Sequence, residues 1–397
     1  MRIARLIVKA GLHDRMWCPV QCKVAADAAL DLDKVALWDK TDGVALPVQA
    51  WREEDGQVSV AWVIPSMVAE ETREFELQAV EGCCAPKLTD GVRLEQVAPG
   101  KLKVFVGGKH FTTYNYGEQV VHPYLYPVLA ADGVGVTRNW PMIEGVAGES
   151  NDHPHHKGIY TAQDAINGNQ NWGEGEGHGW QVHKGFARTF SGPVAGGFTS
   201  KLDWTDHDKN VYMTETRRVT FYLTPQDGRI FDYEVTLHAS EGALTIGDTK
   251  EGGLISARMA SSIEAERENG GIIETGSGGK CQGKDEQETW GKRAPWCDYS
   301  GPVADGWYGI CLMDHLTNPR FPTYWHVRAY GLMTANCFGL HDFYGDPNIR
   351  GDMDIPAGES RTWRYRVMIH HGDATTSNAA LHFESFNYPP SVEVRYH

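Results

Sequence analysis

The sequence of 397 residues lacks the features that define several large classes of protein. It has no run of about 18 or more apolar residues, so we expect no membrane-spanning helix. It contains no GxSxG, GxxxxGK(S/T) or GxGxxG motif. These absences argue against a serine hydrolase, a P-loop nucleoside triphosphatase and a dinucleotide-dependent enzyme.

The sequence also lacks a regular cysteine pattern, and it has fewer basic than acidic residues. The eight cysteines form no CxxC pair and no regular framework, which favours reduced, buried thiols in a cytoplasmic protein. The N-terminal residues show no apolar segment followed by a cleavage site, as a secretory signal would. Lys and Arg total 37 against 52 Asp and Glu, so the formal net charge is -15. Such a charge repels nucleic acid and anionic membranes, and we expect neither as a partner.

Aromatic residues, in contrast, are abundant. They make up 11% of the chain and include 13 Trp. Most of them are expected to fill the core of a β-rich fold. An alternative use is stacking against the C–H faces of sugar rings, which favours a carbohydrate ligand.

Alternation of apolar and polar residues with a period of two predicts that the fold is all-β. Residues 2–11, 57–66 and 73–80 are such segments, and Gly or Asp-Gly turns separate them. We interpret residues 1–86 as a small N-terminal β-sandwich domain that ends in a linker at 83–86. Packing or homo-oligomerisation is its expected role, because it carries no recognisable motif.

Residues 87–397 are predicted to form the second, larger domain. Their many evenly spaced strands predict two large antiparallel sheets stacked face to face. The best helix signal is at 373–386, where Asp373 is a possible N-cap. The Gly-rich segment 164–184 is predicted to be a long loop, and such loops are often functional.

The densest group of chemically active residues is Glu-Ser-Asn-Asp-His-Pro-His-His-Lys-Gly at 149–158. Three histidines within four residues are rare as surface decoration, and neutral imidazole titrates near physiological pH and binds metals. Pro154 favours an extended backbone at His153. On an extended segment His153 and His155 share one face, and His156 points to the other.

Further polar residues stand at the predicted ends or faces of strands. On the predicted strand around 325–328, His326 and Arg328 share one face while Trp325 and Val327 share the other. Placing His and Arg on a strand inside a sheet is costly unless they line a cleft or form a buried network. Surface ion pairs or strand ends explain some of the other candidates equally well, and these are Arg138, Lys250, Glu251, Arg258, Trp290, Lys292, Arg293, Asp298 and His315.

Two chemistries suit the histidine cluster. In the first, neutral histidines act as general acid and base while Arg and Lys hold an anionic or polarised oxygen. In the second, His153 and His155 bind a divalent metal together with a carboxylate such as Glu149 or Asp152. The spacing matches no helix-borne zinc motif, so a metal is possible and no cofactor is certain.

Several motifs, taken in order, resemble a known bacterial family. They are PYLYPVLAADGVGVTRNWPM (123–142), DHPHHKG (152–158), GDTKEG (247–252), WGKRAPWCDYSG (290–301) and TYWHVRAYG (323–331). Over residues 100–372 they resemble the family labelled DUF6807 or "PmoA". The membrane-bound copper subunit that the second label implies does not fit this acidic chain. The family's layout is similar to the galactose-mutarotase-like β-supersandwich, in which aldose epimerases, polysaccharide lyases and some glycosidases bind sugars.

The resemblance implies a carbohydrate ligand, and together with the residues it leads to a functional hypothesis. We expect an enzyme that cleaves a C–O bond of a small glycoside or an oxidised (keto or uronic) sugar by β-elimination or hydrolysis. His155 or His156 would remove a proton, and His326 or Glu251 would protonate the departing oxygen. The remaining roles are substrate binding, with enolate stabilisation by one of Arg138, Lys250 and Arg328.

Two alternatives stay open at this stage. A sugar epimerase or mutarotase would use a His and a Glu as its acid–base pair and would leave the mass of the product unchanged. A non-catalytic sugar-binding protein would depend on its aromatic residues more than on its histidines, and the candidates are Trp140, Trp172, Trp180 and Trp290.

Overall fold

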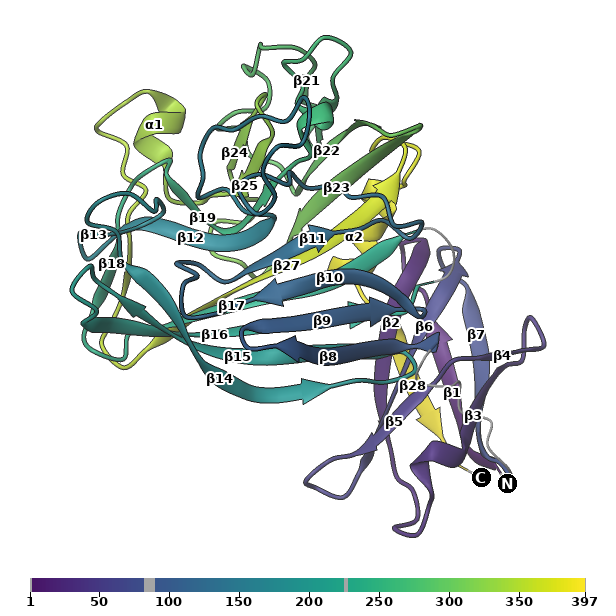
Figure 1. The fold of residues 1–397 in the computed structure, drawn as a ribbon. Helices are drawn as coiled ribbons and strands as arrows, with labels where there is room; N and C mark the ends of the chain where they lie inside the picture. Colours follow the sequence, from purple (N-terminus) through teal and green to yellow (C-terminus); the bar gives the residue numbers. More distant parts are fainter. Residues whose placement is uncertain (1, 82–89, 225–227, 397) are drawn as a thin grey trace.

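The computed structural model describes residues 2–81, 90–224 and 228–396. The expected linker at 83–86 lies outside the described residues. Strands are almost the only regular secondary structure in the described chain, and most of them form large antiparallel sheets, which confirms the predicted fold class (Figure 1). No helix in this part of the chain is both long enough and apolar enough to cross a bilayer.

The N-terminal module consists of two small sheets around their own core. One has the strand order β28-β1-β7-β3-β4 and the other β2-β6-β5. Its core contains Leu6, Trp62 and Phe75. The strand β28, from the C-terminal end of the chain, pairs with β1, so both ends of the chain lie in this module (Figure 1). The strands are β1 (Arg2–Lys9), β2 (Arg15–Val24), β3 (Val35–Asp39), β4 (Val44–Leu46), β5 (Gln49–Arg52), β6 (Val58–Met67), β7 (Thr72–Ala79) and β28 (Ser391–Arg395).

An eleven-stranded sheet forms one layer of the large sandwich. Its main path is β24-β25-β19-β12-β11-β10-β9-β8. The strands are β8 (Val92–Ala98), β9 (Lys101–Val106), β10 (Lys109–Asn115), β11 (Tyr124–Val128), β12 (Ile159–Ile166), β13 (Asn169–Asn171), β18 (Leu244–Ile246), β19 (Gly252–Arg258), β24 (Trp325–Arg328), β25 (Leu332–Ala335) and β26 (Met353–Ile355). Because β12 and β13 occupy part of 164–184, that segment is not one continuous loop.

A nine-stranded sheet forms the second layer, in the order β14-β15-β16-β17-β27-β23-β22-β20-β21. Its strands are β14 (Trp180–Phe190), β15 (Ala195–Thr205), β16 (Val211–Tyr222), β17 (Arg229–His238), β20 (Ile272–Thr275), β21 (Lys280–Cys281), β22 (Trp296–Val303), β23 (Gly306–Asp314) and β27 (Ser360–His371). The helices are α1 (Leu340–Tyr344) and α2 (Ala379–Asn387). Helix α2 begins later than the pattern suggested, because Asn378 has a left-handed backbone (φ 57°).

The main core lies between these two sheets. Phe111 of one sheet packs edge-on against Phe221 and Phe231 of the other. Trp325 and Val327 of β24 belong to this core, whereas His326 and Arg328 do not, which confirms the predicted alternation. The eleven-stranded sheet therefore has an outer face on which His326 lies, together with Arg258 of β19.

Candidate functional site

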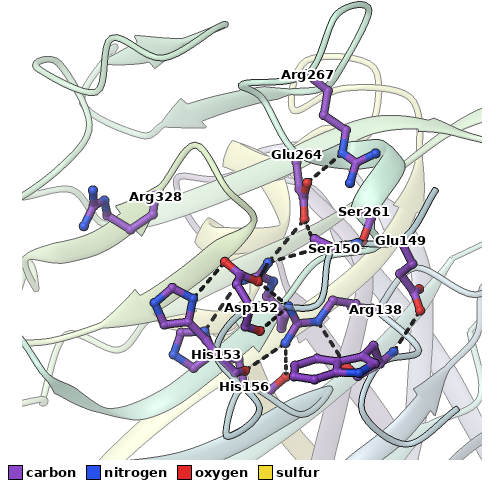
Figure 2. A network of polar contacts seen from close by, with 12 residues as sticks. Arg138, Glu149, Ser150, Asp152, His153, His156, Ser261, Glu264, Arg267 and Arg328 are labelled. Carbon is purple, nitrogen blue, oxygen red and sulfur yellow. Dashed lines mark hydrogen bonds and ion pairs between the residues drawn. The ribbon is translucent and has the colours of Figure 1, made fainter. Parts of the chain in front are cut away.

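The histidine loop is held against this outer face by a buried arginine. The guanidinium of Arg138 donates to the main-chain oxygens of Trp140 (3.0 Å), Asp152 (2.8 Å), His153 (2.9 Å) and His156 (3.3 Å). It also donates to Oδ1 of Asp152 at 2.6 Å (Figure 2). Arg138 is fully buried and its donors are used by the loop. Its position is that of a loop clamp, whereas we expected it to bind substrate.

A second buried arginine holds the same carboxylate. Arg258 donates to Asp152 Oδ1 at 2.7 Å and to Glu264 Oε1 at 3.2 Å. Burial alone would raise the pKa of Asp152, but the hydrogen bond from His153 and the charge of Arg258 outweigh it, so the pKa lies below its ordinary value. Asp152 is therefore ionised at neutral pH, and two guanidinium groups hold its Oδ1 in place.

The free side of Asp152 orients His153. His153 Nδ1 lies 2.8 Å from Asp152 Oδ2, and both side chains are about two-fifths exposed. Because an ionised carboxylate only accepts hydrogen bonds, Nδ1 carries a proton, and in the neutral form of the ring the lone pair is on Nε2. The ring stacks on Tyr330 at 4.9 Å between centroids, which limits its rotation. This arrangement gives a histidine whose Nε2 can accept a proton.

His326 is held in the opposite tautomer. The indole Nε1–H of Trp290 donates to His326 Nδ1 at 2.9 Å, so the imidazole proton is on Nε2. Burial lowers the pKa of His326 to about 3, and the charges of Arg328, Lys250 and His153 add to the effect. His326 is therefore a neutral hydrogen-bond donor at physiological pH.

His155 and His156 are more enclosed than the acid–base roles expected for them require. The Nε2 atoms of both are buried and have no hydrogen-bond partner among the described residues. Burial lowers the pKa of His155 to about 4, and it lowers that of His156 well below the usual value. His156 stacks parallel to His153 at 4.8 Å between centroids. The two residues form the floor beneath His153.

Gly158 allows the histidine loop to pack closely against strand β11. Gly158 has φ +58°, and a Cβ there would lie 2.1 Å from the carbonyl oxygen of Leu125 on β11. Any side chain at this position would push the loop 149–156 away from the sheet, and His156 with it.

Charged groups lie around His153 and His326. Lys250 Nζ lies 3.6 Å from Glu251 Oε1, and both side chains are roughly two-fifths exposed. Arg328 donates to Glu286 at 2.8 Å, and its guanidinium lies over the ring of Tyr330. Figure 2 shows Arg328 apart from the loop network, with no link to it. Lys292 is exposed next to Trp290. Lys250 and Arg328 are thus each paired with a carboxylate.

The structure does not bring all the predicted residues together. Asp298 lies on the nine-stranded sheet, on the other side of the sandwich, where His370 Nε2 binds it at 2.6 Å. His315 follows β23 and packs edge-on against Phe386 of α2. The guanidinium of Arg293 donates to three main-chain oxygens at 320–322. These three residues lie apart from the histidine loop, and their assignment to substrate binding stays a prediction.

The residues present do not fit the expected metal site either. The Glu149 carboxylate accepts the main-chain N–H groups of Asn139 (2.8 Å) and Trp140 (2.9 Å), one on each oxygen. Among the described residues, no group of three or more His, Cys, Asp or Glu side chains is arranged to hold a metal ion. We therefore derive no chemistry from a metal.

Sequence reasoning missed several neighbours of the cluster. Glu264, which neutralises Arg258, comes from a 3₁₀ segment more than a hundred residues from the loop. His122 is buried, and neither of its ring nitrogens has a hydrogen-bond partner among the described residues; its Nδ1 lies 3.7 Å from Oε1 of Glu174, which pairs with Lys157. No local pattern marks these residues, because only the fold brings them near the histidines.

The fold and site define an all-β protein with a histidine-rich face on one large sheet, and comparison places it in a family. The model for the "Family of unknown function (DUF6807)" matches residues 101–384, so the chain belongs to this family. The family description names no activity, and nothing in it supports the "PmoA" label. No curated protein matches the chain.

Two solved structures are distantly similar. A protein in glycosyl hydrolase family 38 from Enterococcus faecalis is 10% identical with a TM-score of 0.46, over 99% of this chain and 47% of that one. The chain thus spans about half the length of that protein. The GalM/aldose epimerase homologue from C. elegans is 8% identical with a TM-score of 0.25, over 71% of this chain and 99% of that one. Neither likeness is strong enough to carry an argument about activity.

Proposed function

We propose that this protein is a carbohydrate-active enzyme that eliminates a C–O bond from an oxidised sugar, a keto-sugar or uronic acid glycoside. The observation that carries the proposal is the opposite orientation of two imidazoles, fixed by the hydrogen bond that each makes through Nδ1. His153 presents a lone pair at Nε2, and His326 presents an N–H at Nε2. A proton acceptor and an uncharged donor on one face suit proton abstraction next to a carbonyl.

The reaction can be written with every atom assigned. His153 Nε2 removes the proton on the carbon next to the sugar's carbonyl or carboxylate, and the C–H electrons form an enolate. The enolate then expels the oxygen on the neighbouring carbon, so that the C–O bond breaks and a C=C bond forms. The His153 imidazolium returns its proton to the departing oxygen. The products are an unsaturated sugar and an alcohol, and no water is consumed.

His326 and the surrounding cations would stabilise the enolate. A hydrogen bond from a neutral donor to a developing oxyanion is favourable in a site with little water. Lys250 and Arg328 supply positive charge without having to lose a proton. The acidic protein as a whole repels anions, so local cations are needed to hold a carboxylated or enolised sugar.

This proposal transfers the base from His155 or His156 to His153. The two original candidates have their Nε2 atoms buried, whereas His153 is exposed and has a carboxylate partner. Glu251 stays a candidate for contact with sugar hydroxyls. The small-molecule sugar partner and the cytoplasmic location both remain predictions.

The direct test is turnover of a panel of keto- and uronic acid glycosides, followed by product mass and absorbance of the conjugated double bond. Elimination predicts two products whose masses add up to that of the substrate, and their loss in His153→Asn. Products that gain one water would indicate hydrolysis, and an isomer of unchanged mass would indicate epimerisation. Either result, or full activity of His153→Asn, would overturn the elimination mechanism.

A further inference from the structure

A concave surface lies between the N-terminal module and the nine-stranded sheet. A cavity of about 390 Å³ is lined by β2, β5 and β6 on one side and by β14 to β17 on the other, with α2 at one end. Figure 1 shows the N-terminal module beside these strands. A smaller hollow of about 130 Å³ shares Arg218, Tyr222 and Asp232 with it, so the two form one continuous groove. The volume is in the range of small-molecule sites.

The groove has aromatic walls from both parts of the molecule. Trp51 of β5 lines it, and its indole is held by a hydrogen bond to Glu53 at 2.9 Å. Phe190, Tyr222 and Phe386 line it from the large sandwich and α2. Aromatic rings that are held in place offer flat apolar surfaces at little entropic cost. Such walls suit the C–H faces of sugar rings.

The charge of the groove is opposite to that of the protein. Four arginines line the two hollows against two carboxylates, Asp232 and Glu234. Arg366 binds Asp232 through Nε at 2.7 Å, and Arg364 binds Glu234 at 2.7 Å. Glu234 also receives Arg218, at 3.3 Å.

Arg188 has no carboxylate partner among the described residues, and its guanidinium lies over the ring of Phe190. A local excess of positive charge in a chain of net charge -15 attracts an anion. Guanidinium groups also match the geometry of a carboxylate, to which they can donate two hydrogen bonds.

From these walls and charges we propose that the groove is a non-catalytic binding site for an acidic oligosaccharide, one that carries uronate carboxylates. Sugar rings pack against Trp51 and the neighbouring aromatic residues, and the carboxylates pair with Arg188 and Arg218. The two joined hollows, of about 390 Å³ and 130 Å³, offer room for more than one sugar unit. The outward-facing residues of β16 and β17 place the groove on the side of the sandwich away from His153. Binding there is independent of the proposed elimination.

The test is calorimetric titration of the full chain with trigalacturonate and, in parallel, with its methyl-esterified, uncharged counterpart. We expect binding of the acid that weakens with added salt, and much weaker binding of the ester. The double variant Arg188→Ala/Arg218→Ala should lose about tenfold in affinity, as expected for the removal of two exposed charges. Trp51→Ala should bind more weakly as well.

Matched variants make the result decisive. Arg350→Ala removes an exposed arginine paired with Asp352 elsewhere, and it should bind like the wild type. His153→Asn should also bind normally, which separates the groove from the catalytic proposal. The inference is overturned by no binding, by equal binding of acid and ester, by unchanged affinity in the double variant, or by loss of binding in His153→Asn. Arg188→Glu on the surface offers a second variant, with a larger expected loss.

Discussion

Two aspartate–histidine pairs lie on opposite sides of the large sandwich, and they are almost equally short. Asp152 and His153 are 2.8 Å apart, and Asp298 and His370 are 2.6 Å apart. The first pair is about two-fifths exposed, whereas the second is almost completely buried. The contact is the same in both, so the surroundings decide what each pair can do.

The two environments also differ in how the charges are balanced. The open pair has two arginines on the far side of its carboxylate, Arg138 and Arg258, and its imidazole reaches solvent. Burial alone would lower the pKa of His370, but the charge and hydrogen bond of Asp298 outweigh it and raise that pKa. The closed pair is therefore suited to stabilising the fold, and the open pair is suited to accepting a proton from a ligand.

The largest effect on activity is expected from a substitution at His153, in the open pair. The backbone of this residue is left-handed (φ 46°), so the extended conformation predicted from Pro154 is wrong. Asn fits this backbone and can still donate to Asp152, but it has no basic nitrogen. In His153→Asn we expect kcat to fall by about 10²–10⁴-fold, the usual contribution of a general base. The free energy of unfolding should change by only about 0.5 kcal/mol, because the side chain is exposed.

His207→Asn is the matched control, because His207 also neighbours an aspartate on the surface, at 3.3 Å. Its turnover should equal that of the wild type. Equal losses in the two variants would show that the open pair has no special role.

The closed pair should give the reverse result. Asp298→Ala leaves His370 buried without its partner, and removal of one member of a buried pair costs about 3–5 kcal/mol. Urea denaturation should show this loss, while kcat of the folded fraction stays near the wild-type value. Asp298→Asn keeps a hydrogen-bonding group and should lose less. A stability within about 0.5 kcal/mol of wild type would mean that the closed pair does not support the fold.

Acid should weaken the protein through the buried histidines of the site. The pKa of His326 is about 3 in the folded protein and about 6.5 when unfolded, so the unfolded chain binds more protons between these values. Stability therefore falls as the pH drops from about 6.5 toward 3. His326→Gln should reduce this slope by up to about 1.4 kcal/mol per pH unit, measured by denaturation at several pH values. His207→Gln should leave the slope unchanged, and an equal slope in His326→Gln would contradict the neutral state of His326.

The smallest expected effect is at Trp290. Trp290→Phe keeps an aromatic ring, smaller than the indole, but removes the N–H that holds His326 in its tautomer. The imidazole can then redistribute its proton, and we expect kcat to fall by about tenfold, the equivalent of one lost hydrogen bond. Stopped-flow or steady-state kinetics with the best substrate would measure the change. Unchanged kcat with normal folding would show that Trp290 does not orient His326.

The sequence predicted the sheets well because period-two patterns are local. The alternation at 325–328 correctly separated Trp325 and Val327, which are in the core, from His326 on the outer face. The prominence of 149–158 could also be seen directly, since neighbours in sequence stay neighbours in the fold. The galactose-mutarotase-like likeness and the domain boundary at residue 86 stay predictions.

The polar partners could not be predicted, because strands distant in sequence supply them. Asp298 and Arg258 both lie on strands with polar residues. However, Arg258 belongs to the eleven-stranded sheet and Asp298 to the nine-stranded sheet, so they lie on opposite sides of the sandwich. Arg138 was expected to bind substrate, because its local sequence does not show that its guanidinium donates to main-chain oxygens of the loop. The sheet to which a strand belongs therefore decides whether its polar residues join the candidate site or a buried structural pair.

The most direct test of the account is the protonation of two histidine rings in the full chain at neutral pH. Ring ¹⁵N chemical shifts of histidine-labelled protein, assigned with His153→Asn and His326→Gln, report the tautomer of each imidazole. We predict a proton on Nδ1 of His153 and on Nε2 of His326, with the His326 ring neutral. The same tautomer in both rings, or a charged His326, would contradict the proposed acceptor and donor pair.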